Sequence, residues 1–323
     1  MSGDHGLRSS LPAAASAIAE NPQLKLTLIG QTDAILYECQ KRNIDPSQFT
    51  LVDAPDIVGM DEKPSVALRK KQQSSLWKSI ELVRGGEVDA VVSAGNTGAM
   101  VAMGRYLLDT LPDIRRPAMC APLPGDSGDT YMLDLGANVD CRPEELLQFA
   151  LMGSALVSCL KPLKAPRVAL LNIGDEAGKG SELVKQAAEL LSANGSINFT
   201  GFVEGFDLFS NKADVIVCDG FVGNIALKVC EGTAAYISRQ LKGKFRDSWY
   251  GMLSGVFVQP LLKEFKRDIN PDHYNGAALL GLRGVVVKSH GSSSKKSFHS
   301  AIRHAAQSVE QNLPNRIAQQ LSQ

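Results

Sequence analysis

The chain has 323 residues, of which 44% are apolar, 21% charged and 6% aromatic, and its 34 basic side chains balance 34 acidic ones. This is an ordinary globular composition, long enough for one large domain or two average ones. It excludes a globally basic nucleic-acid-binding protein and a polyacidic tail, so no nucleic-acid partner is expected.

Strand and helix patterns alternate along almost the whole chain. The short apolar runs that predict strands lie at 25–30, 88–92, 130–136, 167–174, 213–220 and 284–288. The stretches that predict helices lie at 33–42, from Met100 on, and at 143–160, 181–193, 223–241, 295–312 and 316–321. Continuous apolar strands followed by helices favour a mostly parallel sheet covered on both faces, an α/β fold. No linker or repeat interrupts the pattern, so residues 1–323 are expected to form one α/β domain.

The loop at 93–99 separates a predicted strand from a predicted helix. Its backbone N–H groups and hydroxyls, next to a helix N-terminus, suit a phosphate-like anion. It has neither the Walker sequence nor a Gly-x-Gly-x-x-Gly turn. Taken alone, the loop is better explained as a simple tight turn, but polar residues at several other strand ends favour a site. The candidate phosphate ligands are Ser93, Gly95, Asn96, Thr97 and Gly98.

The loop at 172–180 follows another predicted strand and contains Glu176 and Lys179. Lys179 is a candidate to neutralise an anion or polarise a carbonyl, and a solvent-exposed lysine is the alternative. In the next such loop, Asp219 and Asn224 predict a sharp turn at a helix start. A helix cap with no part in a site is the alternative there.

The last strand-end loop, 288–294, concentrates hydrogen-bond donors before a helix and includes Lys288 and His290. A flexible polar loop is the alternative, although the all-valine run before it favours a fixed position. His299 and His304 lie five residues apart, about 140° around a helix, so they are expected to be surface side chains and not a zinc pair. No metal and no cofactor are expected.

Cysteine usage favours a reducing compartment. None of the six cysteines forms a C-x-x-C pair, which predicts reduced thiols in a cytoplasmic protein. Cys218 follows a predicted strand and is expected to be buried, with a role as nucleophile as the alternative.

Residues 242–267 break the alternation and predict a protruding amphipathic helical segment. An apolar patch is flanked there by lysine and arginine, which suits a membrane surface but is too short to span one. A helical hairpin packed in a dimer interface or against the core is the alternative. The candidate membrane-contacting residues are Trp249, Met252, Leu253, Val256 and Phe257.

Several of these segments, taken in order over nearly the whole chain, resemble the acyl-(acyl carrier protein):phosphate acyltransferase family, PlsX. The matching residues are Gly3–Gly6, Lys63–Pro64, Arg69, Ser74–Ser75, Ser93–Ala99, Leu133–Asp140, Asn172–Gly180, Asp219–Asn224, Lys228, Tyr274–Ala277, Leu279–Gly281 and Lys288–Gly291. The family carries an apolar strand before its Gly-Asp segment, whereas this sequence opens with Met1-Ser2-Gly3-Asp4.

The resemblance implies a three-layer αβα fold like that of phosphotransacetylases and isocitrate-type dehydrogenases. It implies a homodimer that transfers a fatty acyl group from acyl carrier protein to inorganic phosphate, giving an acyl phosphate for phospholipid synthesis. It also implies a cytoplasmic protein that binds the membrane peripherally, with a membrane glycerol-3-phosphate acyltransferase as a further partner.

The chemistry implied is direct attack of a phosphate oxygen on a thioester carbonyl, without an acyl-enzyme. The residues expected to act in catalysis are Lys179, Lys288, His290 and Asn224. The residues expected to shape the pocket are Asp4, Asp134, Asn138, Asn172, Glu176, Asp219 and Asn275. Two alternatives remain at this point: a short-chain phosphotransacetylase that uses coenzyme A, and a non-catalytic membrane-associated scaffold.

Overall fold

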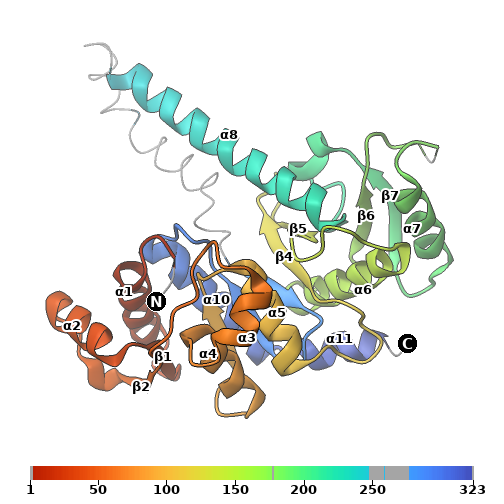
Figure 1. Ribbon diagram of the computed structural model, residues 1–323. Helices are drawn as coiled ribbons and strands as arrows, with labels where there is room; N and C mark the ends of the chain where they lie inside the picture. Colours follow the sequence, from red (N-terminus) through yellow and green to blue (C-terminus); the bar gives the residue numbers. More distant parts are fainter. Residues whose placement is uncertain (1–2, 177, 247–257, 259–275, 322–323) are drawn as a thin grey trace.

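The computed structural model describes residues 3–176, 178–246, 258 and 276–321. Within these residues, an eight-stranded sheet forms the centre and a two-stranded sheet lies beside the N-terminal helices (Figure 1). The strands are β1 Leu26–Gly30, β2 Phe49–Asp53, β3 Ala90–Ser93, β4 Ala118–Leu123, β5 Thr130–Leu133, β6 Arg167–Leu171, β7 Asn198–Val203, β8 Val215–Val217, β9 Ala277–Leu280 and β10 Val285–Lys288. The helices are α1 Leu7–Glu20, α2 Thr32–Arg42, α3 Pro64–Lys70, α4 Ser75–Arg84, α5 Thr97–Leu108, α6 Pro143–Leu160, α7 Glu182–Ala193, α8 Gly220–Arg246, α10 Lys295–Glu310 and α11 Leu313–Leu321, with short 3-10 helices η1 Pro46–Gln48 and η2 Gly205–Phe209.

The large sheet has the order β3-β10-β9-β4-β5-β8-β6-β7. β3 and β10 form one parallel block, and β5, β8, β6 and β7 form another. Between them, β10–β9, β9–β4 and β4–β5 are antiparallel pairs. The expectation of a mostly parallel sheet is confirmed, but the antiparallel centre reverses one block relative to the other. The carboxyl ends of β3 and β10 therefore lie at one edge of the sheet, and those of β5, β6 and β8 lie at the opposite edge.

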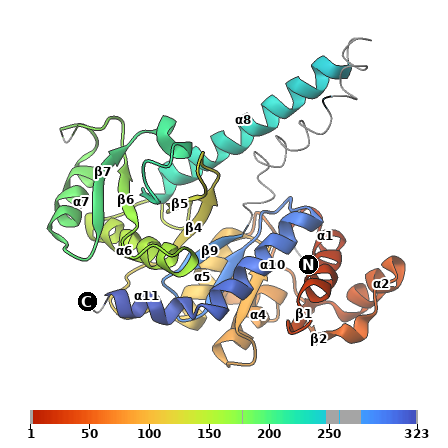
Figure 2. The ribbon, with the colours of Figure 1, turned by 180° about the vertical axis from the view of Figure 1, so that it is seen from behind.

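The predicted strand at 25–30 is present as β1, but it pairs only with β2 among the described residues. These two strands and α2 join α1, which packs along α10 (Figure 2). Leu11, Ile35, Phe49 and Phe298 from four different elements meet in the apolar cluster that joins this unit to α10. The N-terminal unit is thus attached to the large sheet through α10 of the C-terminal region, and β1 also contacts α4.

Helices cover both faces of the large sheet, as expected from its apolar strands. On one face, α6 packs against β5, β8 and α11, and α10 packs against β10 and β3. On the other face, α3, α4 and α5 bury the β3–β10–β9 half. The start of α8 covers the β4–β5–β8 half of that same face, where Ala226, Leu227 and Cys230 join the core. The three-layer αβα architecture is therefore present.

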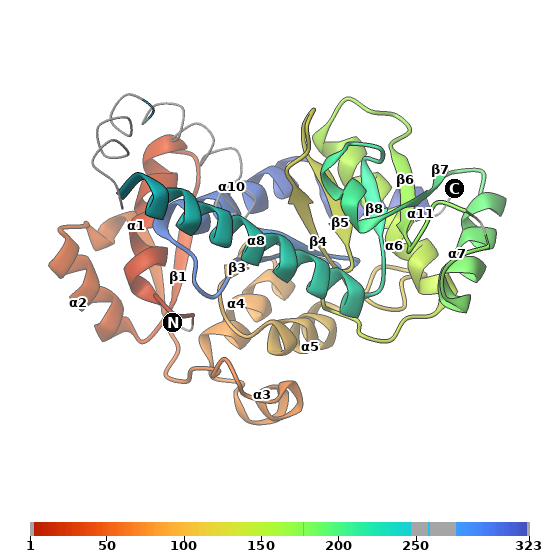
Figure 3. The same cartoon turned by 90° about the horizontal axis from the view of Figure 1, so that it is seen from above.

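Helix α8 is longer than the predicted 223–241 and projects from the body (Figure 1). Seen from above, it runs across the molecule from the β8 end toward α1 (Figure 3). Asp219 starts the helix, because its Oδ1 accepts from the N–H groups of Phe221 and Val222 at 3.0 and 2.9 Å. The predicted membrane residues at 249–257 lie outside the described residues. None of the described helices is both long enough and apolar enough to cross a bilayer.

Candidate active site

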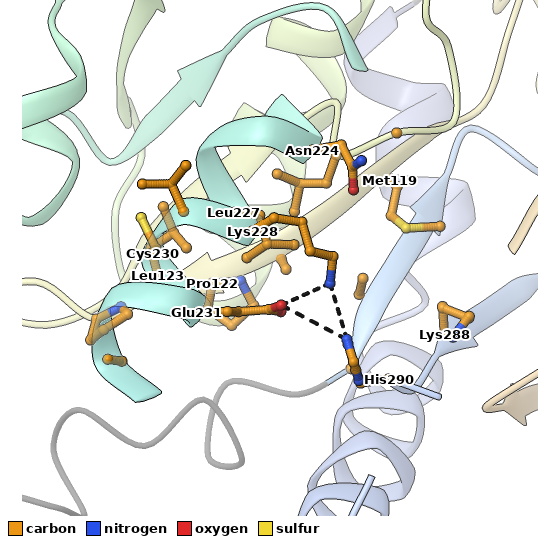
Figure 4. Close-up of a pocket in the computed structure, with 18 of the residues that line it drawn as sticks. Met119, Pro122, Leu123, Asn224, Leu227, Lys228, Cys230, Glu231, Lys288 and His290 are labelled. Atoms are coloured by element: carbon orange, nitrogen blue, oxygen red, sulfur yellow. Dashed lines mark hydrogen bonds and ion pairs between the residues drawn. The ribbon is translucent and has the colours of Figure 1, made fainter. Parts of the chain in front are cut away.

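A cavity of 1260 Å³ lies between α8, β4 and the loop that follows β10 (Figure 4). The side chains on its walls come from segments far apart in the sequence. Its polar lining residues include Asp4, Thr97, Asn224, Lys228, Glu231, Lys288, His290, Ser292 and Ser293. Its apolar lining residues include Met119, Ala121, Pro122, Leu123, Leu135, Phe209, Leu227, Cys230, Ala234 and Ile237.

β4 forms the floor of the cavity through strand alternation. Met119, Ala121 and Leu123 point to one face of the sheet and line the cavity, while Cys120 points to the core on the other face. The segment was not predicted as a strand because it is interrupted by Pro122, which pairs antiparallel with Tyr131 of β5. The floor thus depends on a strand that only the tertiary structure shows.

Asp134, which follows β5, is fully buried and braces this floor. Its carboxylate accepts from the backbone N–H groups of Met119 at 2.9 Å, Ala137 at 3.1 Å and Asn138 at 2.6 Å. The side-chain amide of Asn138 also donates to it at 2.8 Å, and to Pro117 O at 2.8 Å. Burial raises the pKa of Asp134, and the four N–H donors act against that rise. Asp134 and Asn138 therefore brace the backbone of the pocket wall and are not among the residues that line the cavity, and their pocket-shaping role stays a prediction.

Two helix starts lie at this cavity. Thr97 is the first residue of α5, and Ser292 and Ser293 precede α10. The first N–H groups of α8 are instead taken by Asn138 O and by Asp219. The free N–H groups of a helix N-terminus and its partial positive charge favour an anion. The cavity therefore has the backbone electrostatics of a phosphate site at this end.

Lys288, at the end of β10, is the most buried cation of the cavity. It is 8% exposed, and its Nζ donates to the carbonyl of Ser289. Burial lowers the pKa of Lys288 to about 8, and the like charge of Lys228 contributes to the same shift. The side chain thus carries a positive charge near neutral pH and loses it only slightly above.

Lys228, Glu231 and His290 form a connected group on the cavity wall (Figure 4). Lys228 Nζ lies 2.7 Å from Glu231 Oε2 and 3.0 Å from His290 Nε2. Burial and the Lys228 ammonium lower the pKa of His290, so the ring is neutral at pH 7. On its other side, His290 Nδ1 accepts from the backbone N–H of Ser292 at 3.2 Å and lies 2.8 Å from Ser292 Oγ.

Neither Lys228 nor Glu231 was assigned a role from the sequence. Both lie one to two turns after Asn224 on α8, so helical spacing from Asn224 was the signal that could have placed them beside it. Asp4 reaches the same wall, because its backbone N–H donates to Gly291 O at 2.8 Å.

Asn96 does not face the cavity, which corrects its predicted role as a phosphate ligand. It is 6% exposed, and its Oδ1 caps α5 by accepting from Ala99 N–H at 2.9 Å. Its Nδ2 donates to the carbonyls of Gly59, Met60 and Glu62 at 3.1, 2.8 and 2.9 Å. With its donors and acceptor engaged, Asn96 clamps the 59–62 loop onto α5.

Other residues of the 93–99 loop also serve the turn. Ser93 Oγ accepts from Gly95 N–H at 3.1 Å, and a Cβ at Gly98 would come within 2.6 Å of Pro64 Cγ. Of the five predicted phosphate ligands, Thr97 alone is among the residues that line the cavity.

Lys179 lies outside the cavity, on an exposed loop after β6. Its Nζ is paired with Glu176 Oε2 at 2.7 Å, and this hydrogen bond raises the pKa of Lys179. Asn172 is buried and donates to Lys179 O at 3.1 Å, so it supports the loop. Strand order explains the separation, because β9, β4, β5 and β8 lie between β10 and β6 in the large sheet. The assignment of Lys179 to catalysis stays a prediction that this geometry does not support.

The structure also shows where the remaining residues singled out from the sequence lie. Cys218 is buried, and burial raises the pKa of its thiol, as expected of a core cysteine. His299 lies 3.0 Å from Glu20 on α1. His304 is partly buried and hydrogen-bonded to Gly276 O at 2.6 Å, so it is not the surface side chain expected.

Asn275 lies outside the described residues. No group of three metal-ligating side chains gathers within 3–176, 178–246 and 276–321.

The whole chain matches known proteins. A family model described as "Fatty acid synthesis protein" matches residues 1–316. The sequence is 47% identical over 324 residues to the phosphate acyltransferase of Alcanivorax borkumensis, covering 100% of this chain and 96% of that one. It is 48% identical to the phosphate acyltransferase of Pseudomonas aeruginosa strain UCBPP-PA14, covering 98% and 94%. The chain belongs to the phosphate acyltransferase family. It is therefore an enzyme that transfers an acyl group to phosphate.

Solved structures support the architecture of this phosphate acyltransferase. A phosphotransacetylase from Streptococcus pyogenes aligns with a TM-score of 0.63 and 19% identity, over 94% of this chain and 91% of that chain. A branched-chain phosphotransacylase from Enterococcus faecalis aligns with a TM-score of 0.55 and 16% identity, over 88% and 99%. At these identities the likeness shows a common fold.

Proposed function

We propose that this phosphate acyltransferase moves a fatty acyl group from an acyl carrier protein thioester to inorganic phosphate, and that the acyl phosphate serves phospholipid synthesis. One observation carries the proposal: a single cavity joins a cationic end, formed by Lys228, Lys288 and the starts of α5 and α10, to an apolar wall. Phosphate suits the first part and a hydrocarbon chain suits the second.

The reaction needs no acyl-enzyme. An oxygen of HPO₄²⁻ attacks the thioester carbonyl carbon, the carbon–sulfur bond breaks, and the proton of the phosphate passes to the departing thiolate. Lys288 and Lys228 hold the phosphate charge, while Asn224 and Ser292 are placed to donate to it or to the carbonyl oxygen that becomes negative. Fixing both reactants side by side supplies much of the rate increase, and one oxyanion donor is worth on the order of 10²–10³ in turnover.

The test is thiol release from an acyl carrier protein thioester, with and without phosphate. We expect release only with phosphate, together with formation of an acyl phosphate. Lys288→Gln should reduce kcat/KM for phosphate on the order of 10²-fold, whereas Lys185→Gln, an exposed α7 lysine paired with Glu182, should not. Trapping of a covalent acyl-enzyme in a single turnover would contradict direct transfer.

Coenzyme A thioesters test the second candidate donor. The solved structures named above are those of a phosphotransacetylase and a phosphotransacylase, which makes a short-chain reaction the natural competitor. Higher kcat/KM for acetyl-coenzyme A than for a long-chain acyl carrier protein thioester would select it. Absence of phosphate-dependent cleavage with any thioester, alongside liposome binding, would select the scaffold.

We also propose that the enzyme is a homodimer whose interface includes α8. Phe221, Val222, Ile225 and Tyr236 are 40–57% exposed, recur on its outward side, and are not part of the cavity lining. Large apolar side chains exposed along one helix face mark an interaction surface. Each chain, residues 1–323, is then one catalytic unit of the dimer.

Peripheral binding to the cytoplasmic membrane surface is proposed from sequence alone, because residues 249–257 lie outside the described part. Cations before and after the apolar patch suit anionic lipid. A membrane glycerol-3-phosphate acyltransferase that consumes the acyl phosphate is the proposed partner there. Co-sedimentation with anionic liposomes, lost in Trp249→Asp, is the measurement.

A further inference from the structure

The cavity is far larger than phosphate needs. Its 1260 Å³ exceeds the roughly 300–1,000 Å³ of most small-molecule pockets, whereas a water molecule takes up about 30 Å³. Most of its charged groups lie along the wall from Lys288 to Glu231. Beyond Glu231 the lining is mainly apolar, with the hydroxyl of Thr233 and the carboxylate of Asp126 as its polar groups.

The apolar part of the cavity extends away from the cationic end along β4 and α8. β4 and α8 both extend away from the Asn224 end, and Figure 4 shows Leu123 and Cys230 on the side away from Lys288. At its far end, Phe209 and Ile237 are 39% and 43% exposed although they line the cavity. The loop at 124–128 is tied to this end, because Asp126 N–H donates to Phe209 O at 3.0 Å.

We propose that this part of the cavity, lined by Leu123, Leu227, Cys230, Ala234 and Ile237 and called here the acyl trough, measures the length of the acyl chain. Ala234 and Ile237 are the α8 positions that set the limit. The proposal rests on the proposed function, because it takes the reacting carbonyl to lie at the cationic end. The occupant is a hydrocarbon chain, because the trough has an apolar lining and is continuous with the cationic end.

The length of the trough fits a long fatty acyl chain. At a rise of 1.5 Å per residue, Asn224 and Ile237 lie about 20 Å apart along α8, and Asn224 and Ala234 about 15 Å apart. Carbon–carbon bonds of about 1.5 Å at tetrahedral angles advance an extended chain by roughly 1.25 Å per carbon. A chain of roughly sixteen carbons therefore reaches Ile237, and one of roughly twelve reaches Ala234.

The experiment compares acyl carrier protein thioesters from octanoyl to octadecanoyl by phosphate-dependent thiol release. Ala234→Phe should lower kcat/KM for hexadecanoyl relative to octanoyl at least tenfold, because the ring blocks the distal trough. Ala235→Phe is the matched control. Ala235 is the next residue on α8, is exposed and does not line the cavity, so the wild-type ratio should persist.

Ile237→Ala provides a change in the opposite direction. Opening the far end should move the optimum to longer chains, which a loss of folding cannot imitate. If Ala234→Phe fails to fold, an unchanged optimum in Ile237→Ala overturns the proposal by itself.

The outcomes separate the two proposals. Wild-type enzyme without phosphate-dependent release from any thioester overturns the proposed function. An active wild type with an Ala234→Phe variant that keeps the wild-type ratio, or loses octanoyl and hexadecanoyl turnover equally, overturns the acyl trough and leaves the proposed function standing.

Discussion

At the scale of residues, two buried polar side chains have opposite tasks. Lys288 is 8% exposed with a single hydrogen bond from its Nζ to protein, so it is available to an anion in the cavity. Asp134 is fully buried and accepts four hydrogen bonds, so it has no capacity left for a substrate. Burial with unused hydrogen-bonding capacity indicates a binding group, and burial with complete hydrogen bonding indicates a structural one.

The pKa of Lys288 predicts the alkaline limit of activity. Because it is about 8, kcat/KM for phosphate should fall as the pH rises through about 8, where the ammonium loses its proton. Lys228→Met removes a like charge and should move this alkaline limb to higher pH, whatever it does to the maximum rate. Lys185→Met, on α7, should leave the limb in place. A limb that does not move in Lys228→Met would contradict the coupling of the two lysines.

Removing the Asp134 carboxylate should destabilise the protein strongly. Asp134→Ala leaves the buried N–H groups of Met119, Ala137 and Asn138 without their acceptor, and each costs about 1–3 kcal/mol, so the free energy of unfolding should fall by at least about 3 kcal/mol. Urea unfolding measures this. Asp61→Ala, at an exposed turn, should change it by less than about 0.5 kcal/mol. A similar loss in both variants would refute the bracing role.

At the scale of elements, α8 joins the site to the core. Its first turn packs so closely on the end of β5 that a Cβ at Gly223 would lie 1.9 Å from Asp134 O. Lys228 and Glu231 then follow on the cavity side, and the later turns leave the body (Figure 3). The position of the cationic wall is therefore set by backbone contact at the start of the helix.

This close approach predicts that Gly223→Ala shifts α8. The methyl group cannot fit against the Asp134 carbonyl, so the variant should lose several kcal/mol of stability, in line with overpacking costs of about 1–3 kcal/mol or more, and should lose activity as Asn224 and Lys228 move. Gly232→Ala is the control on the same helix. Its Cβ would meet open space, so stability should rise by up to about 1 kcal/mol from helix propensity. Thermal unfolding and thiol release measure both variants.

At the scale of the whole molecule, the outward side of α8 faces solvent in the single chain. Ile225 and Tyr236 are 47% and 55% exposed on a helix that projects from the body. A second copy of the chain would bury this face, as the proposed homodimer requires.

Ile225→Asp should therefore weaken the dimer. A carboxylate buried at an apolar interface is costly, so sedimentation at micromolar concentration should show monomer where the wild type is dimeric. Asp33→Asn, on exposed α2, should sediment as wild type. A wild-type chain that sediments as monomer at all concentrations, or an Ile225→Asp variant that stays dimeric, would remove α8 from the interface.

Local sequence determined the elements whose patterns are strong. The strand before Ser93, the strand ending at Lys288 and the helix at 143–160 were all predicted, because uninterrupted apolar runs and helical periodicity leave few alternatives. β4, with Pro122 inside it, and β9, with four residues, were missed since their strand conformation depends on antiparallel partners in the centre of the sheet.

Some residues of the site could likewise be predicted from local sequence, and others could not. The sequence by itself predicted a site at the Lys288–His290 loop and Asn224, because polar residues after buried strands at a helix start indicate a ligand site, and these residues line the cavity. Only the tertiary structure decided that Lys228 and Glu231 join His290, that Asn96 is a cap, and that Lys179 lies elsewhere. The physical reason is strand order: β9, β4, β5 and β8 separate β10 from β6, and only long-range strand pairing sets this order.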